Sequence, residues 1–455
     1  MKIQMKYIFT GLLMFCALSS FAQNKLSLQD CRDKALEHNK EKKISRLMRG
    51  KANYDKKTYL AKFFPHIAAD GNYMFTSKKF EKHTPELTIP TLTGQMPNIT
   101  QSGFIHIPAY PLSLSLNKNW TAGVNITQPL YMGGRIRAAY KMSKIGEDMA
   151  HINEILTNNE VVYQTDMAYW NLLKVQELLN AALAYQKVVE HLMLDVENAF
   201  EVGMKSRNDV LKVKVKLNEA KLKTRRVENA IKLSKMNLCH IVGLPLLADV
   251  EINDSVINES SFASITIFDN IENRPEYQLL SKKLDLTKQE IKLARGEYLP
   301  QAGVRGGWNY YDALKFNDNS LIKGGSFSAI FSVSIPLFKW GEGVNKVRSM
   351  KVQHQMAELQ RENISEKMQL EMTMALNQVD ESSLEVEMTS EALKSATENL
   401  KTSKEHYEVG LETLTNFLEA QTLWHKASAE FIEAKAQLKL NETNYLKSSG
   451  QLYIE

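Results

Sequence analysis

Cysteine and histidine are the residues of this chain that most readily suggest chemistry, but their spacing supports little of it. The ten histidines are scattered, with no His-x-x-x-His pair, and the chain has neither a glycine-rich phosphate loop nor a Gly-x-Ser-x-Gly motif. Cys239 and His240 are adjacent, but neighbouring residues on a helix point in different directions and no second pair accompanies them. We therefore expect no enzyme activity, no cofactor and no metal site.

The first 22 residues have the layout of a secretory signal peptide. Lys2 and Lys6 precede an apolar run over residues 7–18, and Ser20-Phe21-Ala22 supplies small residues at both recognition positions of a cleavage site. No later segment approaches the roughly 20 apolar residues that a membrane-spanning helix needs. We expect a secreted chain without a transmembrane helix. Lipidation at Cys16 is the less favoured alternative, because bulky residues precede it where small ones are usual.

The charge of the chain limits the classes of partner that we expect, and its cysteine content limits the expected disulfide bonding. The formal net charge of the chain is +5, and removing residues 1–22 takes away two lysines and no acids, which leaves +3. This near-neutral balance argues against nucleic acid as a partner. The processed chain keeps Cys31 and Cys239, and one pair is no disulfide framework. We expect two buried free thiols, with a single disulfide as the alternative.

Two motifs recur at one constant spacing, which indicates an internal duplication. Pro129-Leu130 recurs as Pro336-Leu337, and Val202-Gly203 recurs as Val409-Gly410, each 207 residues later. The segments between the two motifs therefore match in length.

These intervening segments have the pattern of long helices. They are free of proline, and five large apolar residues of the first copy recur at intervals of seven, which is coiled-coil periodicity. The five are Met142, Met149, Leu156, Tyr163 and Trp170. Residues 135–202 would form one helix on the order of 100 Å long, at about 1.5 Å per residue. Ser206 and Thr413 can each cap a returning helix, which in the first copy runs to about His240. Each copy is predicted to be a long antiparallel helical hairpin.

The periodicity changes from seven to two in four segments outside the hairpins. Apolar residues alternate with polar ones or glycine after Pro65, before Pro129, after Pro300 and before Pro336, interrupted on the polar side of the last segment only by Ile330. The apolar positions include Ala69, Tyr73, Phe75, Trp120, Ala122, Val124, Ile126, Ala302, Val304, Trp308, Tyr310, Phe327, Ala329, Phe331, Val333 and Ile335. The pattern predicts four amphipathic strands.

These strands have two interpretations. A half-buried sheet of a soluble domain needs a packing layer, and no spare helix of suitable length lies nearby in the sequence. In a secreted chain we favour strands that face lipid on the apolar side and water on the other, with aromatic residues near the membrane surfaces. Four strands cannot close a barrel, and an open edge in lipid leaves backbone groups unpaired at several kcal/mol each, so this interpretation requires self-association.

Together these motifs resemble the TolC family of outer-membrane efflux proteins over nearly the whole processed chain, and Asn273-Arg274-Pro275-Glu276-Tyr277 is also similar to the family. The resemblance implies a mainly α fold with a small β part: duplicated helical hairpins forming an α-barrel tunnel, plus four strands per chain in a trimeric 12-stranded outer-membrane β-barrel. The implied domains are signal peptide 1–22, first repeat 23–240, equatorial linker 241–270 and second repeat 271–455.

The function implied by the resemblance is that of the outer-membrane exit duct of a tripartite efflux pump. Such a homotrimer sits in outer-membrane lipid with a long periplasmic extension. It passively conducts small molecules such as drugs or metals from a periplasmic adaptor and an inner-membrane pump of RND or ABC type. Type I protein secretion through the same kind of duct is an alternative. A periplasmic adaptor, which has one hairpin between soluble β modules, is the alternative from another class.

The resemblance also implies site residues. Asp209 and Tyr407 match two positions that link helices at the periplasmic gate, and Asn416 and Glu419 match an acidic ring of which one acid is kept. Glu412 stands where the best-known pattern has a latching arginine, and cannot make the same link. The adaptor-contact tips would be Val202, Gly203 and Met204 together with Val409, Gly410 and Leu411. Pro129 and Pro336 would bend the chain where strand becomes helix.

One long segment separates the two strands of the first copy. Pro65 and Pro300 correspond at an offset of 235 residues, so the first copy has 28 extra residues between Pro65 and Pro129. Residues 77–110 contain several prolines and show no sustained period of two or seven. We predict a long loop at the extracellular end, either a mobile surface loop or a partial lid over the exit.

Overall fold

The structure is a computed structural model that describes residues 25–76, 79–93, 100–115, 119–252, 271–316 and 319–452. The predicted signal peptide and residues 253–270 of the predicted linker lie outside this part of the chain. The molecule divides into two compact units. The helical unit comprises Met1–Lys51, Glu147–Leu284 and Ala357–Glu455, and the strand unit comprises Ala52–Gly146 and Asp285–Met356.

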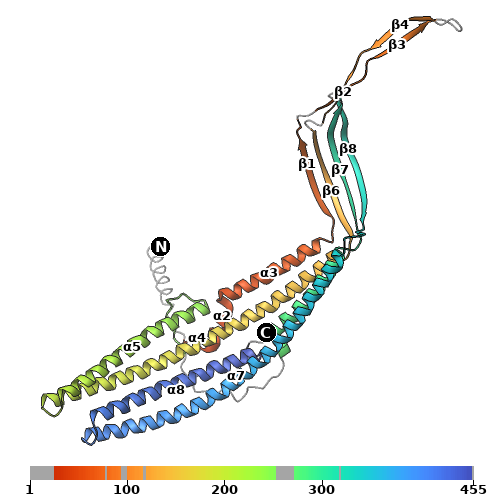
Figure 1. The fold of residues 1–455 in the computed structure, drawn as a ribbon. Helices are drawn as coiled ribbons and strands as arrows, with labels where there is room; N and C mark the ends of the chain where they lie inside the picture. Colours follow the sequence, from red (N-terminus) through yellow and green to blue (C-terminus); the bar gives the residue numbers. More distant parts are fainter. Residues whose placement is uncertain are drawn as a thin grey trace, which may run out of the picture. The chain divides into compact units, whose positions relative to one another are not determined.

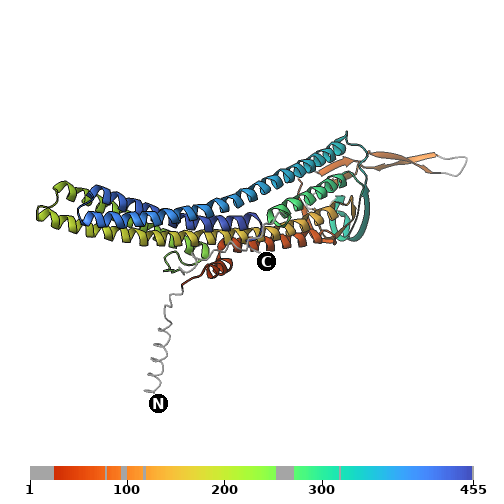
Figure 2. The same cartoon turned by 90° about the horizontal axis from the view of Figure 1, so that it is seen from below.

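Two long helical hairpins dominate the chain, as predicted (Figure 1). Helix α4 (Arg135–Glu201) is followed by α5 (Arg207–Val242), and α7 (Glu342–Glu408) by α8 (Leu414–Ser448). Both α4 and α7 contain 67 residues, and their first residues are 207 apart. Within the helical unit α4 runs beside α5, and α7 beside α8 (Figure 2). The duplication read from the sequence is therefore a duplication of structure.

Shorter helices precede each pair of strands. Helices α2 (Leu28–His38) and α3 (Lys40–Ala61) come first, and the second copy opens with the 3-10 helix η3 (Ile271–Asn273) and α6 (Pro275–Gly296). Arg274, in the motif that resembles the family, is buried and donates to Glu371 on α7 at 3.1 Å. Arg274 therefore has a structural role, because this bond holds the start of the second copy against the hairpin that follows.

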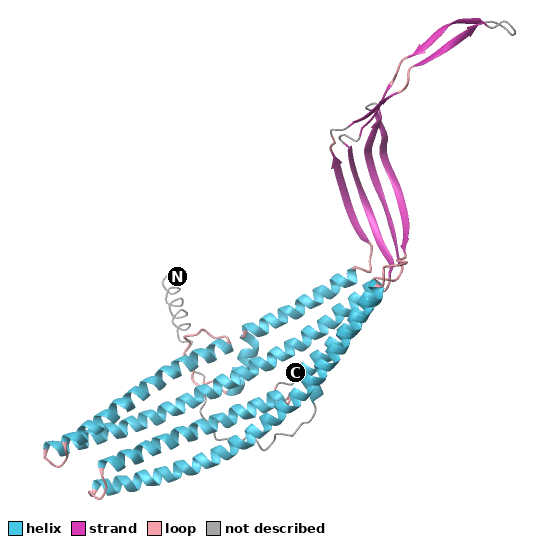
Figure 3. Cartoon of the chain, in the orientation of Figure 1, coloured by secondary structure: helices cyan, strands magenta, loops and turns pink. Residues whose placement is uncertain are grey.

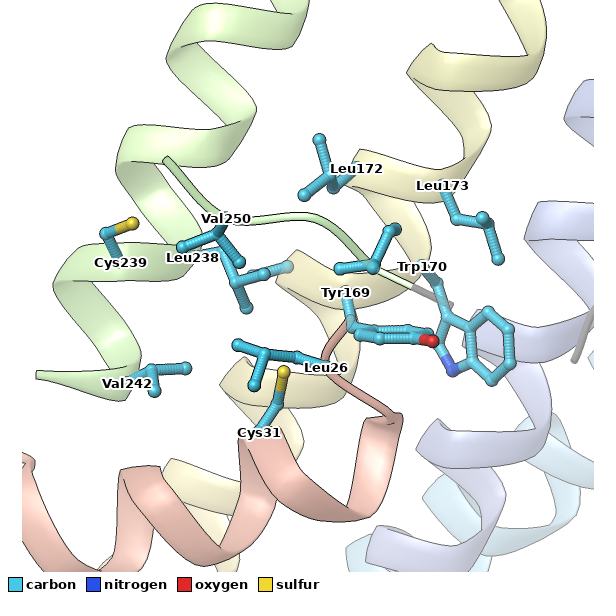
Figure 4. Close-up of a cluster of buried hydrophobic side chains, with 12 residues drawn as sticks. Leu26, Cys31, Tyr169, Trp170, Leu172, Leu173, Leu238, Cys239, Val242 and Val250 are labelled. Carbon is cyan, nitrogen blue, oxygen red and sulfur yellow. The ribbon is translucent and has the colours of Figure 1, made fainter. Parts of the chain in front are cut away.

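A buried cluster joins α2 to the first hairpin (Figure 4). Cys31 and Cys239 both lie in it, beside Tyr169, Leu172 and Leu238, and both are free thiols, so the preferred alternative of the sequence analysis is the one observed. Burial raises the pKa of Cys31 to about 12, which keeps this thiol protonated and unreactive at neutral pH.

One ion pair is buried nearby. The Arg32 guanidinium donates to both carboxylate oxygens of fully buried Asp166, at 2.7 and 2.5 Å. Such a planar two-bond contact compensates part of the cost of removing the carboxylate from water. It fixes α2 against α4.

The four predicted strands form one antiparallel sheet (Figure 3). They are β1 (His66–Met74), β6 (Asn119–Met132), β7 (Gln301–Phe316) and β8 (Asn319–Ser334), hydrogen-bonded in the order β1-β6-β7-β8. The register confirms the predicted faces. One row across the four strands is apolar, namely Ala69, Val124, Trp308 and Phe327, and the adjacent row is polar or small, namely Asp70, Gly123, Asn309 and Ser326.

The prediction of a long loop over residues 77–110 is wrong. The described residues there form β2 (Lys79–His83), β3 (Leu87–Thr93) and β4 (Thr100–Ile107), and β5 (Pro111–Ser115) follows. Strand β2 pairs with β5, and β3 pairs with β4. The prolines do not prevent these strands, because Pro85 and Pro108 lie between the two ladders, while Pro90 lies in a two-stranded ladder in which both strands are edges, where proline is tolerated.

In the described ranges, no helix is both long enough and apolar enough to cross a membrane. Those residues also contain no group of three or more metal-ligating side chains placed to hold an ion.

Candidate functional site

Each hairpin turns through a glycine-centred helix cap. At the first tip Gly203 has φ +78°, its N–H donates to Phe200 at 3.0 Å, and the N–H of Met204 donates to Ala199 at 2.8 Å. These two bonds define a Schellman motif, which needs a residue that adopts left-handed backbone. The second tip repeats it at Gly410, with φ +79° and donor distances of 3.1 and 2.8 Å.

The residues flanking these glycines are apolar and unusually exposed. Val202 and Met204 at the first tip, and Val409 and Leu411 at the second, are between 69% and 79% exposed. Each tip therefore presents two large apolar side chains to its surroundings.

The returning helices begin at strong N-caps. Ser206 and Asp209 form a capping box in which Asp209 accepts from the Ser206 hydroxyl at 2.7 Å and from its backbone N–H at 3.2 Å. The bonds from Ser206 lower the pKa of Asp209 below its ordinary value, because they favour the charged carboxylate. At the second tip Thr413 accepts from the Asn416 N–H at 3.3 Å. Asp209 thus caps its own helix.

Polar contacts join the two hairpins just behind the tips. The Lys205 ammonium of the first hairpin lies 4.5 Å from the centre of the Tyr407 ring, and this ring stacks on Phe417 of its own hairpin at 5.0 Å between ring centres. The Lys212 ammonium donates to the Thr415 hydroxyl at 3.2 Å. Cation–π contacts of this kind are worth about 0.5–1 kcal/mol each where they are exposed, so the link that these polar contacts make between the hairpins is weak.

Asp209 and Tyr407 belong to one small cluster, in which Lys205 contacts Tyr407 and also acts on the charge of Asp209. The sequence analysis missed Lys205, Lys212, Thr415 and Phe417. Their closeness to the tip glycines was the available signal, because the contacts of Lys205, Lys212 and Thr415 cross between hairpins about 200 residues apart, whereas Phe417 contacts Tyr407 within the second hairpin.

The two residues matched to an acidic ring share one side of α8. Asn416 and Glu419 are exposed and three residues apart, whereas Phe417, Leu418 and Ala420 between and beside them are buried against the hairpins. Spacing by three places residues on one helix face.

At the other end of the long helices, paired residues with positive φ make the turn from strand to helix. Pro129 lies within β6, at a bulge opposite Gly303, and Gly133 and Gly134 with φ +62° and +80° precede α4. Pro336 follows β8, and Trp340 and Gly341 with φ +48° and +79° precede α7. Each proline therefore lies a few residues before the turn itself.

Among the residues that the structure describes, the sheet has two open edges. Strand β1 pairs with β6 and β8 pairs with β7, and each has its other side without a described ladder. Large apolar residues on one face, including Phe327, Phe331 and Trp308, are exposed. A hollow on the opposite face is lined by Asp70, Asn125, Asn309 and Arg305, and Asn125 donates to Asp70 at 2.8 Å.

These features define a class of protein. A duplicated long hairpin joined to a sheet with one apolar and one polar face, both sheet edges open, is the subunit of an outer-membrane channel. The model of the outer membrane efflux protein family matches residues 32–244 and 267–451, so the chain belongs to this family. Its location in the outer membrane follows, as predicted.

The similarity extends to characterised relatives. The outer membrane protein TolC of Escherichia coli K12 is 20% identical over 356 residues, which covers 74% of this chain and 71% of that protein. The crystal structure of the Campylobacter jejuni CmeC outer membrane channel has a TM-score of 0.72 at 17% identity, covering 94% of this chain and 86% of CmeC. The open-state Neisseria gonorrhoeae MtrE outer membrane channel has a TM-score of 0.72 at 16% identity, covering 93% and 89%.

Proposed function

We propose that three copies of this chain form the exit duct of a tripartite efflux pump. The duct passively conducts small molecules, such as drugs or metals, from a periplasmic adaptor and an inner-membrane pump to the exterior. The observation that carries the proposal is the pair of open edges on β1 and β8 of a sheet with an exposed apolar face. In lipid those edges need partners, and β8 of one copy beside β1 of the next supplies them, so that three copies close a 12-stranded barrel.

The helices support the same assembly. On α7, exposed Met356, Leu370 and Leu384 recur at intervals of 14 residues, or two heptads. On α5, exposed Leu211, Val215 and Leu222 have the spacing of four and seven that marks a coiled-coil seam. Apolar stripes of this kind on both hairpins fit contacts between neighbouring copies.

The assembly is tested by extracting outer membranes with detergent. We expect a heat-sensitive trimer in that fraction. A folded monomer in the periplasmic fraction would overturn the proposal. Loss of the chain should also raise the retention of a fluorescent pump substrate in cells, and unchanged retention would remove the efflux role.

The partner is tested at the tips. A photo-crosslinking phenylalanine analogue placed at Met204 or Leu411 should capture an adaptor in intact cells. The same analogue at Leu247 is the matched control, because Leu247 is 88% exposed and lies outside the hairpin tips. Capture at Leu247 but at neither tip would place the adaptor contact elsewhere.

A further inference from the structure

The β3–β4 hairpin is an exposed element that neither the membrane sheet nor the helical hairpins need. In the antiparallel register Leu87 faces Ile107 and Ile89 faces Ile105, so these four side chains share one face of the ladder. All four are between 41% and 55% exposed. The opposite face carries Thr88 and His106, which hydrogen-bond each other at 3.2 Å, and also Pro90 and Phe104, of which Phe104 is 66% exposed.

An isolated two-stranded hairpin is at best marginally stable in water. An aliphatic face on such a hairpin, with no described helix or strand packed against it, indicates a surface that another molecule covers. The four residues defined above, Leu87, Ile89, Ile105 and Ile107, are called the aliphatic face below.

The strands that lead into the hairpin are hydrogen-bonded to the sheet. Strand β5 pairs with β7 at Leu114 opposite Phe316, which is the end of β7 far from its junction with the helices. The β2–β5 ladder continues from there, and Thr84 and Tyr110, at its far end, bond each other at 3.0 and 2.8 Å. Hydrogen bonds therefore extend from the sheet to the residues that lead into the hairpin.

A charged band separates the hairpin from the apolar face of the sheet. Glu81, Lys82 and His83 are consecutive exposed residues on β2, and three residues of strand span roughly 10 Å at about 3.3 Å each. The charged side chains of Glu81 and Lys82 are unfavourable within the apolar layer of a membrane, so the hairpin emerges into water beyond it. Lipid tails are therefore a poor occupant for the aliphatic face.

We infer that the aliphatic faces of the β3–β4 hairpins of neighbouring copies pack against one another and form a collar at the exit of the channel. The inference rests on the proposed trimer, because three sheets in a ring would place the bases of three hairpins at the same height around one axis. Equivalent faces of copies related by a three-fold axis meet at that axis, so the three hairpins lean inward, bury their four aliphatic residues against one another, narrow the exit and tie the ring together.

The test is disulfide formation between copies in the full-length chain, with a matched pair of variants. Ile105→Cys lies in the aliphatic face, and His106→Cys is the next residue on the opposite face. Cys31 and Cys239 are buried, and the unaltered chain serves as the background control. After mild oxidation of whole cells we expect at least about tenfold more crosslinked dimer from Ile105→Cys than from His106→Cys, because a disulfide requires Cα atoms within about 7 Å.

The other outcomes are distinguishable. If trimers form normally but neither cysteine variant crosslinks, or both crosslink equally, the collar is overturned and the proposed function still stands. Absence of crosslinks together with protection of Ile105→Cys from a water-soluble maleimide would show that lipid or another protein covers the face, and would also overturn it. Absence of trimers from the unaltered chain would remove the proposed function, and the collar with it.

A second measurement avoids cysteine chemistry. Replacing residues 87–107 by a two-residue turn should lower the temperature at which the trimer dissociates and raise its single-channel conductance. Trimers that keep both properties would overturn the collar.

Discussion

Substituting the tip glycines tests whether the turn geometry matters to transport. Gly410 has φ +79°, and a Cβ added there would meet no heavy atom within 4 Å. The cost of a side chain is therefore purely that of left-handed backbone, about 1–2 kcal/mol for an ordinary residue and more for a β-branched one. Gly203 has the same geometry, with φ +78° and open space around the added atom.

This cost can be compared with what holds the turn. The two capping bonds, from Gly410 to Tyr407 and from Leu411 to His406, contribute about 1 kcal/mol each. Strain from Gly410→Val therefore matches or exceeds the energy of the cap, and we expect the turn to open locally. It is small beside the roughly 5–15 kcal/mol that stabilises a folded domain, so the chain should still fold and assemble. Opening the cap shifts Tyr407 away from Phe417 and Lys205.

The assay is export of a fluorescent pump substrate, with trimer content of the outer membrane measured in the same cells. We expect Gly203→Val and Gly410→Val to assemble normally and to lose most of their export. Gly410→Asn is the matched control, because asparagine tolerates left-handed backbone, and it should retain export. Normal export by both valine variants would remove the tips from the mechanism, and equal loss with asparagine would show that backbone strain is not the cause.

Three further predictions concern the pore, the helical core and the strand-to-helix turn. If Glu419 lines a narrow passage, three like charges attract cations, so Glu419→Gln should reduce cation preference in planar bilayers; unchanged selectivity would place it off the pore. Burial lowers the pKa of His425, so the stability that its neutral form provides is complete above about pH 6.5 and is lost as the pH falls through the folded-state pKa. His425→Phe preserves the ring stack on Tyr185 and should flatten the acid side of a plot of Tm against pH, and an unaltered acid slope would exclude His425 as its source. Gly133→Ala should lower trimer yield strongly, because the added Cβ would lie 2.2 Å from the backbone oxygen of Gly296, whereas Gly134→Ala meets no atom within 4 Å and should cost only about 1–2 kcal/mol of backbone strain. Equal yields of the two variants would contradict the crowding argument.

Much of the fold was predictable because its signals are local. Heptad spacing, the proline-free stretches, and the caps at Ser206 and Thr413 predicted both hairpins, and the helix boundaries agree within one or two residues at α4 and α5. Alternation with period two predicted the four strands and both faces of the sheet. The β2–β5 and β3–β4 ladders were missed because their strands are short, and the prolines around them favour a loop when pairing partners are unknown.

By itself, the sequence determined the duplication, the helical hairpins, the amphipathic strands and the membership in an outer-membrane family. Periodicity and turn residues act over a few neighbouring positions and repeat along the chain, so they can be read without knowing what lies nearby in space. Only the tertiary structure decided that Lys205 meets Tyr407, that Lys212 meets Thr415, and that four aliphatic residues of β3 and β4 share one exposed face. Such contacts depend on strand register and on how separate helices pack, and these are set by the combined burial of many side chains rather than by any local pattern.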